Sequence, residues 1–197
     1  KLSKTPWSGT YWPTAQGGIT VRWQTQKSDS MDFRDYLHKF NTPAQLRAMS
    51  TAEIAKLSAA EKYDLWNDRF DFTASNSLTN RERQRMLLEA RRSKEIFGAK
   101  EETVPFWAGI CNGWTLSATK EPQPVQSVPV KNSAGQTITF FPDDVKALAS
   151  QIYNDFQFQD QTNLKGLNDK GEEVIVKGFS LSLGRICLPE PNNANGT

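Results

Sequence analysis

The sequence predicts an α+β fold in which a helical part precedes a part that mixes helices and strands. Residues 31–98 carry apolar side chains at helical spacing behind repeated helix-start signals. Residues 99–197 instead contain short runs typical of strands, separated by proline and turn residues. With 37% hydrophobic residues and 11% aromatics, the 197-residue chain can bury a core.

Residues 1–30 form an aromatic N-terminal segment. Its four large aromatic side chains are Trp7, Tyr11, Trp12 and Trp23. Because large aromatic side chains favour burial away from water, we expect the segment to pack onto the main body. The alternating run at residues 18–23 is typical of a strand.

Helix-start signals recur in residues 31–98, which we interpret as a helical subdomain. Ser50, Ser58 and Thr79 each precede a glutamate by three residues. This is the pattern of a capping box, in which the hydroxyl and the glutamate satisfy free backbone N–H groups. The three boxes predict three helix starts.

Smaller signals predict two further helices and one helix end in this subdomain. Pro43 suits the first turn of a short helix. Apolar side chains from Met31 to Phe40 recur at helical spacing and predict a helix there. Gly98 is placed to end the last long helix, because glycine adopts the left-handed conformation that terminates helices.

Residues 99–197 change character. Helical patterns are confined to residues 111–120 and 143–156. Turn residues at 132–135 predict a hairpin between the first two strand candidates. The strand candidates are residues 125–130, 137–141 and 173–179.

Charge and composition exclude several function classes. A net charge of +2 is too small to indicate nucleic-acid or membrane-surface binding, and no apolar run approaches the ~20 residues of a membrane span. The acidic residues between Asp155 and Glu173 do not follow the spacing of an EF-hand loop. We expect no required cofactor; calcium stays a possible ligand, although no motif supports it.

Cys111 is the strongest candidate for a catalytic residue. It opens the predicted helix at residues 111–120, between Gly109 and Gly113. At a helix N-terminus, unpaired N–H groups and the helix dipole favour the thiolate and can stabilise an oxyanion. A small buried cysteine without function is the alternative.

The neighbours of the thiol are candidates for supporting roles. Asn112 follows Cys111 directly and can contribute to the oxyanion site. Trp107 and Trp114 flank the thiol in sequence, and we expect them to contact substrate and exclude water.

The segment Trp107-Ala108-Gly109-Ile110-Cys111-Asn112-Gly113-Trp114 resembles the nucleophile motif of the transglutaminase elicitor family, secreted protein-glutamine gamma-glutamyltransferases of oomycetes and related bacterial proteins. Four further segments resemble parts of that family, in the same order along the chain. These are Tyr11-Trp12-Pro13, Ala60-Glu61-Lys62-Tyr63-Asp64-Leu65, Glu121-Pro122-Gln123-Pro124-Val125 and Phe141-Pro142-Asp143-Asp144-Val145-Lys146-Ala147-Leu148.

The resemblance implies a secreted or periplasmic thiol acyltransferase that crosslinks proteins. Cys111 would form a thioester with a protein glutamine and pass the acyl group to a lysine amine or to water. Residues 99–197 would be the nucleophile-bearing first half of a papain-like core. Cys187 resembles a cysteine that precedes the family's catalytic histidine, and we interpret it as a structural thiol.

The sequence offers no convincing catalytic histidine for Cys111. A thiol acyltransferase needs a base to take the thiol proton and return it to the leaving amine. The single histidine, His38, lies in the predicted helical subdomain, and we interpret it as structural. We therefore expect processing after Thr197, with a separate C-terminal chain of the same precursor supplying the histidine and an acid.

Three alternatives stay open at this point. A disulfide between Cys111 and Cys187 would lock the thiol until it is reduced. The same fold and nucleophile also suit a cysteine protease or amidase. Finally, the chain can serve as a binding or elicitor module without catalysis.

Overall fold

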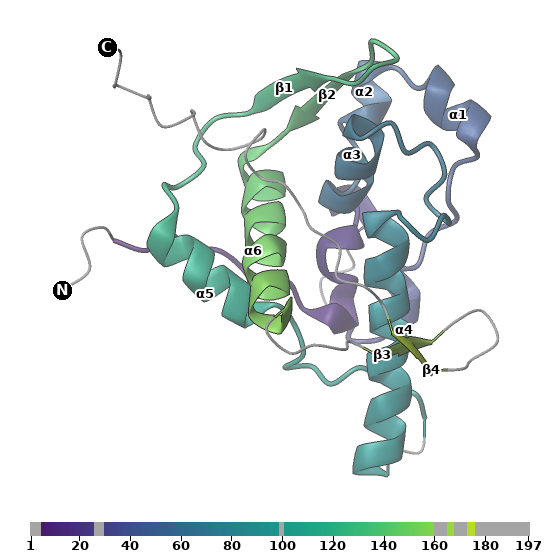
Figure 1. The fold of residues 1–197 in the computed structure, drawn as a ribbon, viewed down its shortest axis with the longest axis vertical. Helices are drawn as coiled ribbons and strands as arrows, with labels where there is room; N and C mark the ends of the chain where they lie inside the picture. The colour runs from purple at the N-terminus through teal and green to yellow at the C-terminus, as the bar shows by residue number, and fades with distance from the viewer. Residues whose placement is uncertain (1–4, 26–29, 99–100, 160–164, 168–172, 176–197) are drawn as a thin grey trace.

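The computed structural model describes residues 5–25, 30–98, 101–159, 165–167 and 173–175 (Figure 1). Within these ranges, the helices occur together with two antiparallel two-stranded sheets, which agrees with the predicted α+β class. A papain-like core is a finer statement and stays a prediction. The elements are the 3-10 helices η1 (Thr14–Gln16), η2 (Gly18–Thr20), η3 (Trp23–Thr25) and η4 (Phe33–Tyr36), the helices α1 (Pro43–Ala48), α2 (Thr51–Ile54), α3 (Ala59–Trp66), α4 (Leu78–Phe97), α5 (Cys111–Lys120) and α6 (Pro142–Gln159), and the strands β1 (Val128–Lys131), β2 (Thr137–Phe140), β3 (Lys165–Leu167) and β4 (Glu173–Ile175).

Capping boxes begin the three short helices α1 to α3. The Ser50 and Ser58 side chains each accept a hydrogen bond from the backbone of the glutamate three residues on, and that glutamate reaches back. Both predicted boxes are therefore confirmed. Thr42 forms a third box with Gln45 ahead of Pro43, which confirms the short helix predicted there.

The box predicted at Thr79 is wrong, because α4 begins two residues earlier with Ser77 as its N-cap. The buried carboxylate of Asp64, from α3, accepts hydrogen bonds from the backbone N–H groups of Leu78 and Thr79 at 2.8 and 2.9 Å. A side chain from another helix thus satisfies two of the free backbone donors in the first turn of α4. At the other end, Gly98 has φ +62°, as the predicted helix end requires.

Residues 18–23 do not form the predicted strand. Gly17 and Gly18 have φ values of +84° and +51°, and the chain turns through η1 and η2 there. The Thr20 hydroxyl donates to the Gly17 carbonyl oxygen at 2.8 Å, which closes the turn. Alternation alone cannot make a strand where the backbone turns, and no described strand pairs with this segment.

The helix predicted from Met31 to Phe40 is also wrong, since only the short η4 forms. The chain becomes extended at Leu37. The carbonyl oxygen of His38 accepts a hydrogen bond from the Arg83 guanidinium of α4 at 2.9 Å instead of bonding within a helix. Tertiary contacts therefore override the helical pattern.

The hairpin β1–β2 forms as predicted, with Val128 opposite Phe140 and Lys131 opposite Thr137. On β2, Ile138 and Phe140 face the core and are completely buried. Of the third predicted strand, residues 173–179, the described part Glu173–Ile175 forms β4, and residues 176–179 lie outside the described residues.

Two hydrophobic clusters hold the described residues together. The larger cluster draws on segments from Trp7 to Ile152, so the N-terminal aromatics Trp7 and Trp12 share a core with β2 and α6. In Figure 1 the N-terminal segment passes behind α5 and α6. The smaller cluster joins α4 to the loop before α5, and its buried members are Ala15, Phe33, Met86, Ala90, Val104 and Ala108. None of the described helices is long and apolar enough to cross a membrane.

Helices α5 and α6 cross in direct backbone contact at Gly113 (Figure 1). A Cβ placed on Gly113 would lie 1.9 Å from the Ser150 carbonyl oxygen and 2.6 Å from the Asn154 nitrogen. One turn along, the hydroxyls of Ser117 and Ser150 lie 3.4 Å apart. Only small residues allow the two helices to approach this closely. The contact fixes α5 against α6 just after the first turn of α5.

Gly113→Ala is expected to destabilise the protein by at least ~3 kcal/mol, because the added methyl group must push two packed backbones apart. Chemical denaturation with a fluorescence readout measures the free energy of unfolding. Ala118→Gly, elsewhere on α5, serves as the comparison, with an expected loss of ~1 kcal/mol from helix propensity and a little packing. Equal losses in the two variants would contradict a close approach of the two backbones at Gly113.

Candidate functional site

Cys111 is the first residue of α5, as the sequence predicted. Its side chain is exposed, and its thiol is free within the described part of the chain. The thiol donates a long hydrogen bond to the Asn112 side-chain oxygen, with 3.9 Å between sulfur and oxygen. An accessible thiol at this position differs from the buried cysteine of the structural alternative.

The N-terminus of α5 keeps donors available beside the thiol. Ile110 is the N-cap residue and provides no side-chain acceptor. The backbone N–H groups of Cys111 and Asn112 find no hydrogen-bond acceptor among the described residues. Donors of this kind can bind a developing oxyanion next to the sulfur.

Two large aromatic side chains stand exposed just before the nucleophile. Phe106 is 69% exposed and Trp107 is 62% exposed. Trp114, the other predicted substrate contact, is partly buried and packs against the core, with its indole nitrogen beside Gly9. Sequence reasoning selected Trp107 and Trp114 but missed Phe106, whose exposure follows from the loop conformation rather than from a motif.

Within the described part of the chain, His38 contacts Glu61 and Phe40, and the Cys111 thiol bonds to Asn112 instead. The His38 Nε2 donates to the Glu61 carboxylate at 2.9 Å, and its Nδ1 is buried without a partner among the described residues. The same Glu61 accepts two short bonds from Arg22, of 2.6 and 2.9 Å. Burial would raise the pKa of Glu61, but the bonds from His38 and Arg22 outweigh it and lower that pKa to about 2.

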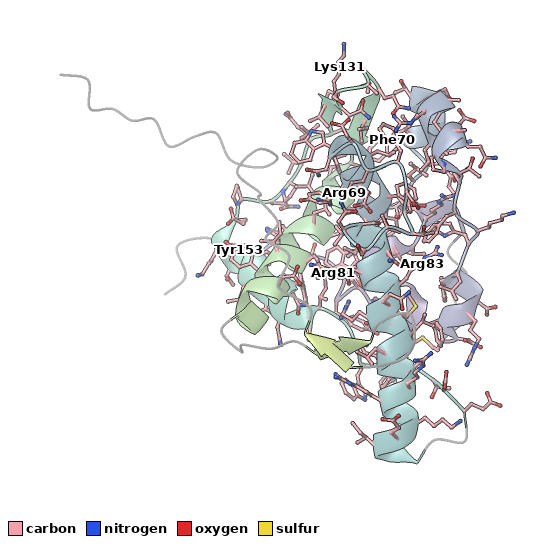
Figure 2. All side chains as sticks on the ribbon, turned by 45° about the vertical axis from the view of Figure 1, so that its right-hand side comes forward. Arg69, Phe70, Arg81, Arg83, Lys131 and Tyr153 are labelled. Carbon is pink, nitrogen blue, oxygen red and sulfur yellow. The ribbon has the colours of Figure 1, made fainter. Side chains whose placement is uncertain are left out.

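His38 therefore lies in a network of charged side chains, and we see no reaction site around it among the described residues. Arg83, which Figure 2 labels on α4, lies 3.8 Å from the centroid of the Phe40 ring and donates to the His38 carbonyl. Burial lowers the pKa of Arg83 to about 10. Within the described part of the chain, no hydrogen bond links His38 to Cys111.

The described residues contain no group of three potential metal ligands from histidine, cysteine, aspartate and glutamate. Asp155, from the acidic stretch, is engaged by Arg81 of α4 at 2.7 Å. Burial raises the pKa of Asp155, and the attraction of Arg81 opposes that rise. Cys187 lies outside the described residues.

A family model described as transglutaminase elicitor matches residues 1–163. The chain belongs to the transglutaminase elicitor family. The resemblance carried by the segment around Cys111 is thereby confirmed. Searches of the curated proteins and of the solved structures found no match for this chain.

Two of the segments that carry the resemblance to the transglutaminase elicitors contact each other in the core. Lys62 of α3 and Asp144 of α6 form an ion pair of 2.6 Å, and both side chains are completely buried. Asp144 also accepts a hydrogen bond from the Phe141 backbone at 2.8 Å, and the Lys62 ammonium lies 4.4 Å from the centroid of the Phe141 ring. This pair ties the helical part to the part that carries Cys111.

Proposed function

We propose that this transglutaminase elicitor is the nucleophile-bearing part of a protein-glutamine acyltransferase. The exposed thiol of Cys111 at the uncapped start of α5 carries the proposal. Asn112 would contribute its backbone N–H to the oxyanion site, and Trp107, Phe106 and Trp114 would line the approach of the substrate. A papain-like core and a secreted or periplasmic location belong to the same proposal, as does a structural role for Cys187.

The chemistry balances with the groups of a glutamine and a lysine. The Cys111 thiolate attacks the glutamine carboxamide carbon, the C–N bond breaks, and the nitrogen leaves as ammonia with one added proton. A lysine amine then attacks the thioester, forms an isopeptide bond and releases the thiol. Water in place of the amine gives glutamate, so exclusion of water favours crosslinking over deamidation.

Among the described residues, the hydrogen-bond partner of the Cys111 thiol is the Asn112 side-chain oxygen, which cannot act as the base. His38, the one histidine of the sequence, is occupied by Glu61. We therefore propose that a second chain of the same precursor supplies the catalytic histidine and its acid. No cofactor enters this chemistry.

Amine incorporation tests the proposal directly. The native protein, together with any chain that co-purifies with it, is incubated with a glutamine peptide and a fluorescent primary amine. We expect the amine to enter the peptide and ammonia to be released, both abolished by prior alkylation of Cys111. Cleavage of peptide bonds without amine incorporation would indicate the protease or amidase instead. Activity of the isolated 197-residue chain would refute the need for a second chain.

A non-catalytic binding or elicitor module is the second candidate. The exposed Phe106 and Trp107, and the occupied His38, favour it. In that case, the response of recipient cells would survive replacement of Cys111 and would be abolished by replacement of the two aromatics. Abolition of the response by replacement of Cys111 alone would exclude a purely non-catalytic role.

Trp107→Ala is expected to raise KM for the glutamine peptide roughly tenfold with little change in kcat, because the tryptophan should stabilise the bound peptide equally in the ground and transition states. Steady-state kinetics at varied peptide concentration measure both constants. Trp23→Ala, another partly exposed tryptophan, should leave both unchanged. A fall in kcat with unchanged KM in Trp107→Ala would contradict this role in substrate binding.

A further inference from the structure

The backbone just before Cys111 is hydrogen-bonded to residues of the N-terminal segment. The Ile110 N–H donates to the Tyr11 carbonyl oxygen at 2.9 Å, and the Thr14 N–H donates to the Ala108 carbonyl oxygen at 2.9 Å. The Tyr11 hydroxyl donates to the Phe106 carbonyl oxygen at 2.8 Å. We call residues 11–14 the clamp, because they bond the loop at residues 106, 108 and 110.

Gly109 shows how closely the clamp approaches. A Cβ built on Gly109 would lie 2.5 Å from the Tyr11 carbonyl oxygen, 2.7 Å from the Tyr11 ring and 3.1 Å from the Trp12 carbonyl oxygen. Cβ atoms in proteins do not approach backbone oxygens this closely, so a side chain at position 109 would force the loop and the clamp apart.

Both partners in this contact are anchored in the interior. Trp12 is 3% exposed and adopts φ +47°, a backbone conformation that a bulky residue keeps only when its surroundings impose it. On the loop side, Ile110 is buried in the larger cluster and Ala108 in the smaller one. The clamp and the loop therefore meet as two fixed surfaces, and Phe106 and Trp107 project from the loop into solvent.

We infer that the clamp positions Cys111, with Tyr11 and Gly109 as positioning residues. Ile110 is the N-cap of α5, so its bond to Tyr11 fixes the residue that sets the direction of the first turn. The bond thereby keeps a fixed distance between the Cys111 sulfur and the free backbone N–H groups of Cys111 and Asn112. The inference rests on the proposed function in that it takes Cys111 as the nucleophile, and small displacements of such a group reduce rates steeply.

Gly109→Ala tests the clamp without requiring an activity assay. We expect alkylation of Cys111 by iodoacetamide to slow ~2–5-fold, because the thiolate loses its alignment with the α5 N-terminus. We also expect hydrogen exchange at the Ile110 amide to accelerate. Peptide-resolved mass spectrometry measures both and separates Cys111 from Cys187. If Gly109→Ala does not fold, Tyr11→Phe, which deletes one hydroxyl, is expected to show the same changes to a smaller extent.

Two control variants separate positioning from general destabilisation. Gly135→Ala places alanine at φ +79° in the hairpin turn, with no atom within 4 Å of the new Cβ, and therefore adds strain away from the clamp. Tyr36→Phe removes a similar bond, from a tyrosine hydroxyl to the Ser30 carbonyl at 2.6 Å. Both should alkylate at the parent rate. Parent-like alkylation and exchange in folded Gly109→Ala and Tyr11→Phe would overturn the inference, as would equal changes in the controls.

Steady-state kinetics of Gly109→Ala test the role of the clamp separately from the acyltransferase activity itself. If the native protein incorporates amines, Gly109→Ala should lower kcat ~10-fold or more with KM within about twofold of the parent. If the parent incorporates none, the acyltransferase proposal fails on its own. The alkylation and exchange results then still decide whether the clamp holds Cys111.

Discussion

Cys111→Ala is expected to reduce amine incorporation by ~10³-fold or more, to the background of the assay, because no other described group can form the thioester in its place. The protein should stay folded, since the Cys111 side chain is exposed and its thiol makes only a long bond to Asn112 within the described part of the chain. The change removes the nucleophile and leaves the start of α5 intact. Amine incorporation and the free energy of unfolding are measured on the same preparation.

Cys187→Ala is the matched control, because it removes the only other cysteine of the sequence. We expect it to keep amine incorporation near the parent level. Acid-quenched samples of the parent with glutamine peptide should also contain a thioester on the Cys111 peptide, seen as a mass increase equal to the peptide minus ammonia. An adduct on Cys187, or full activity in Cys111→Ala, would contradict the assignment of the nucleophile.

Lys62→Met is expected to lower the free energy of unfolding by about 3–5 kcal/mol. The Lys62 ammonium and the Asp144 carboxylate are both completely buried, so removing one leaves the other charged in a medium that solvates it poorly. Methionine keeps nearly the length of the lysine stem, so the loss of stability reports the missing charge rather than a cavity. Urea denaturation followed by tryptophan fluorescence measures it.

Lys146→Met provides the matched comparison on α6. Lys146 pairs at 3.2 Å with Asp143, whose side chain is 65% exposed, so water replaces the missing partner and we expect a change below ~1 kcal/mol. Adding Asp144→Leu to Lys62→Met should recover part of the stability, because no unpaired charge remains. Recovery stays incomplete, since the Phe141 N–H also loses its acceptor. A decrease of under ~1 kcal/mol for Lys62→Met would contradict the importance of the pair.

Local signals in the sequence were sufficient for much of the fold. The capping boxes at Ser50 and Ser58, the helix opened by Cys111 and the hairpin between β1 and β2 all form as predicted. Each depends on groups a few residues apart, whose hydrogen bonds and φ preferences do not need the rest of the chain. The family resemblance likewise lay in short contiguous segments, and the match over residues 1–163 confirms it.

Only the tertiary structure decided the features that depend on distant residues. The Asp64 carboxylate moved the start of α4 to Leu78, and Arg83 holds the segment at His38 out of a helix. The occupation of His38 by Glu61 and the closeness of Tyr11 to Gly109 had no local signature. The sequence by itself therefore determined which residue is the candidate nucleophile and the helix that it opens. What faces that residue, and what holds it, depends on packing between segments far apart in the chain, because burial and buried hydrogen bonds are satisfied by whichever groups the fold brings together.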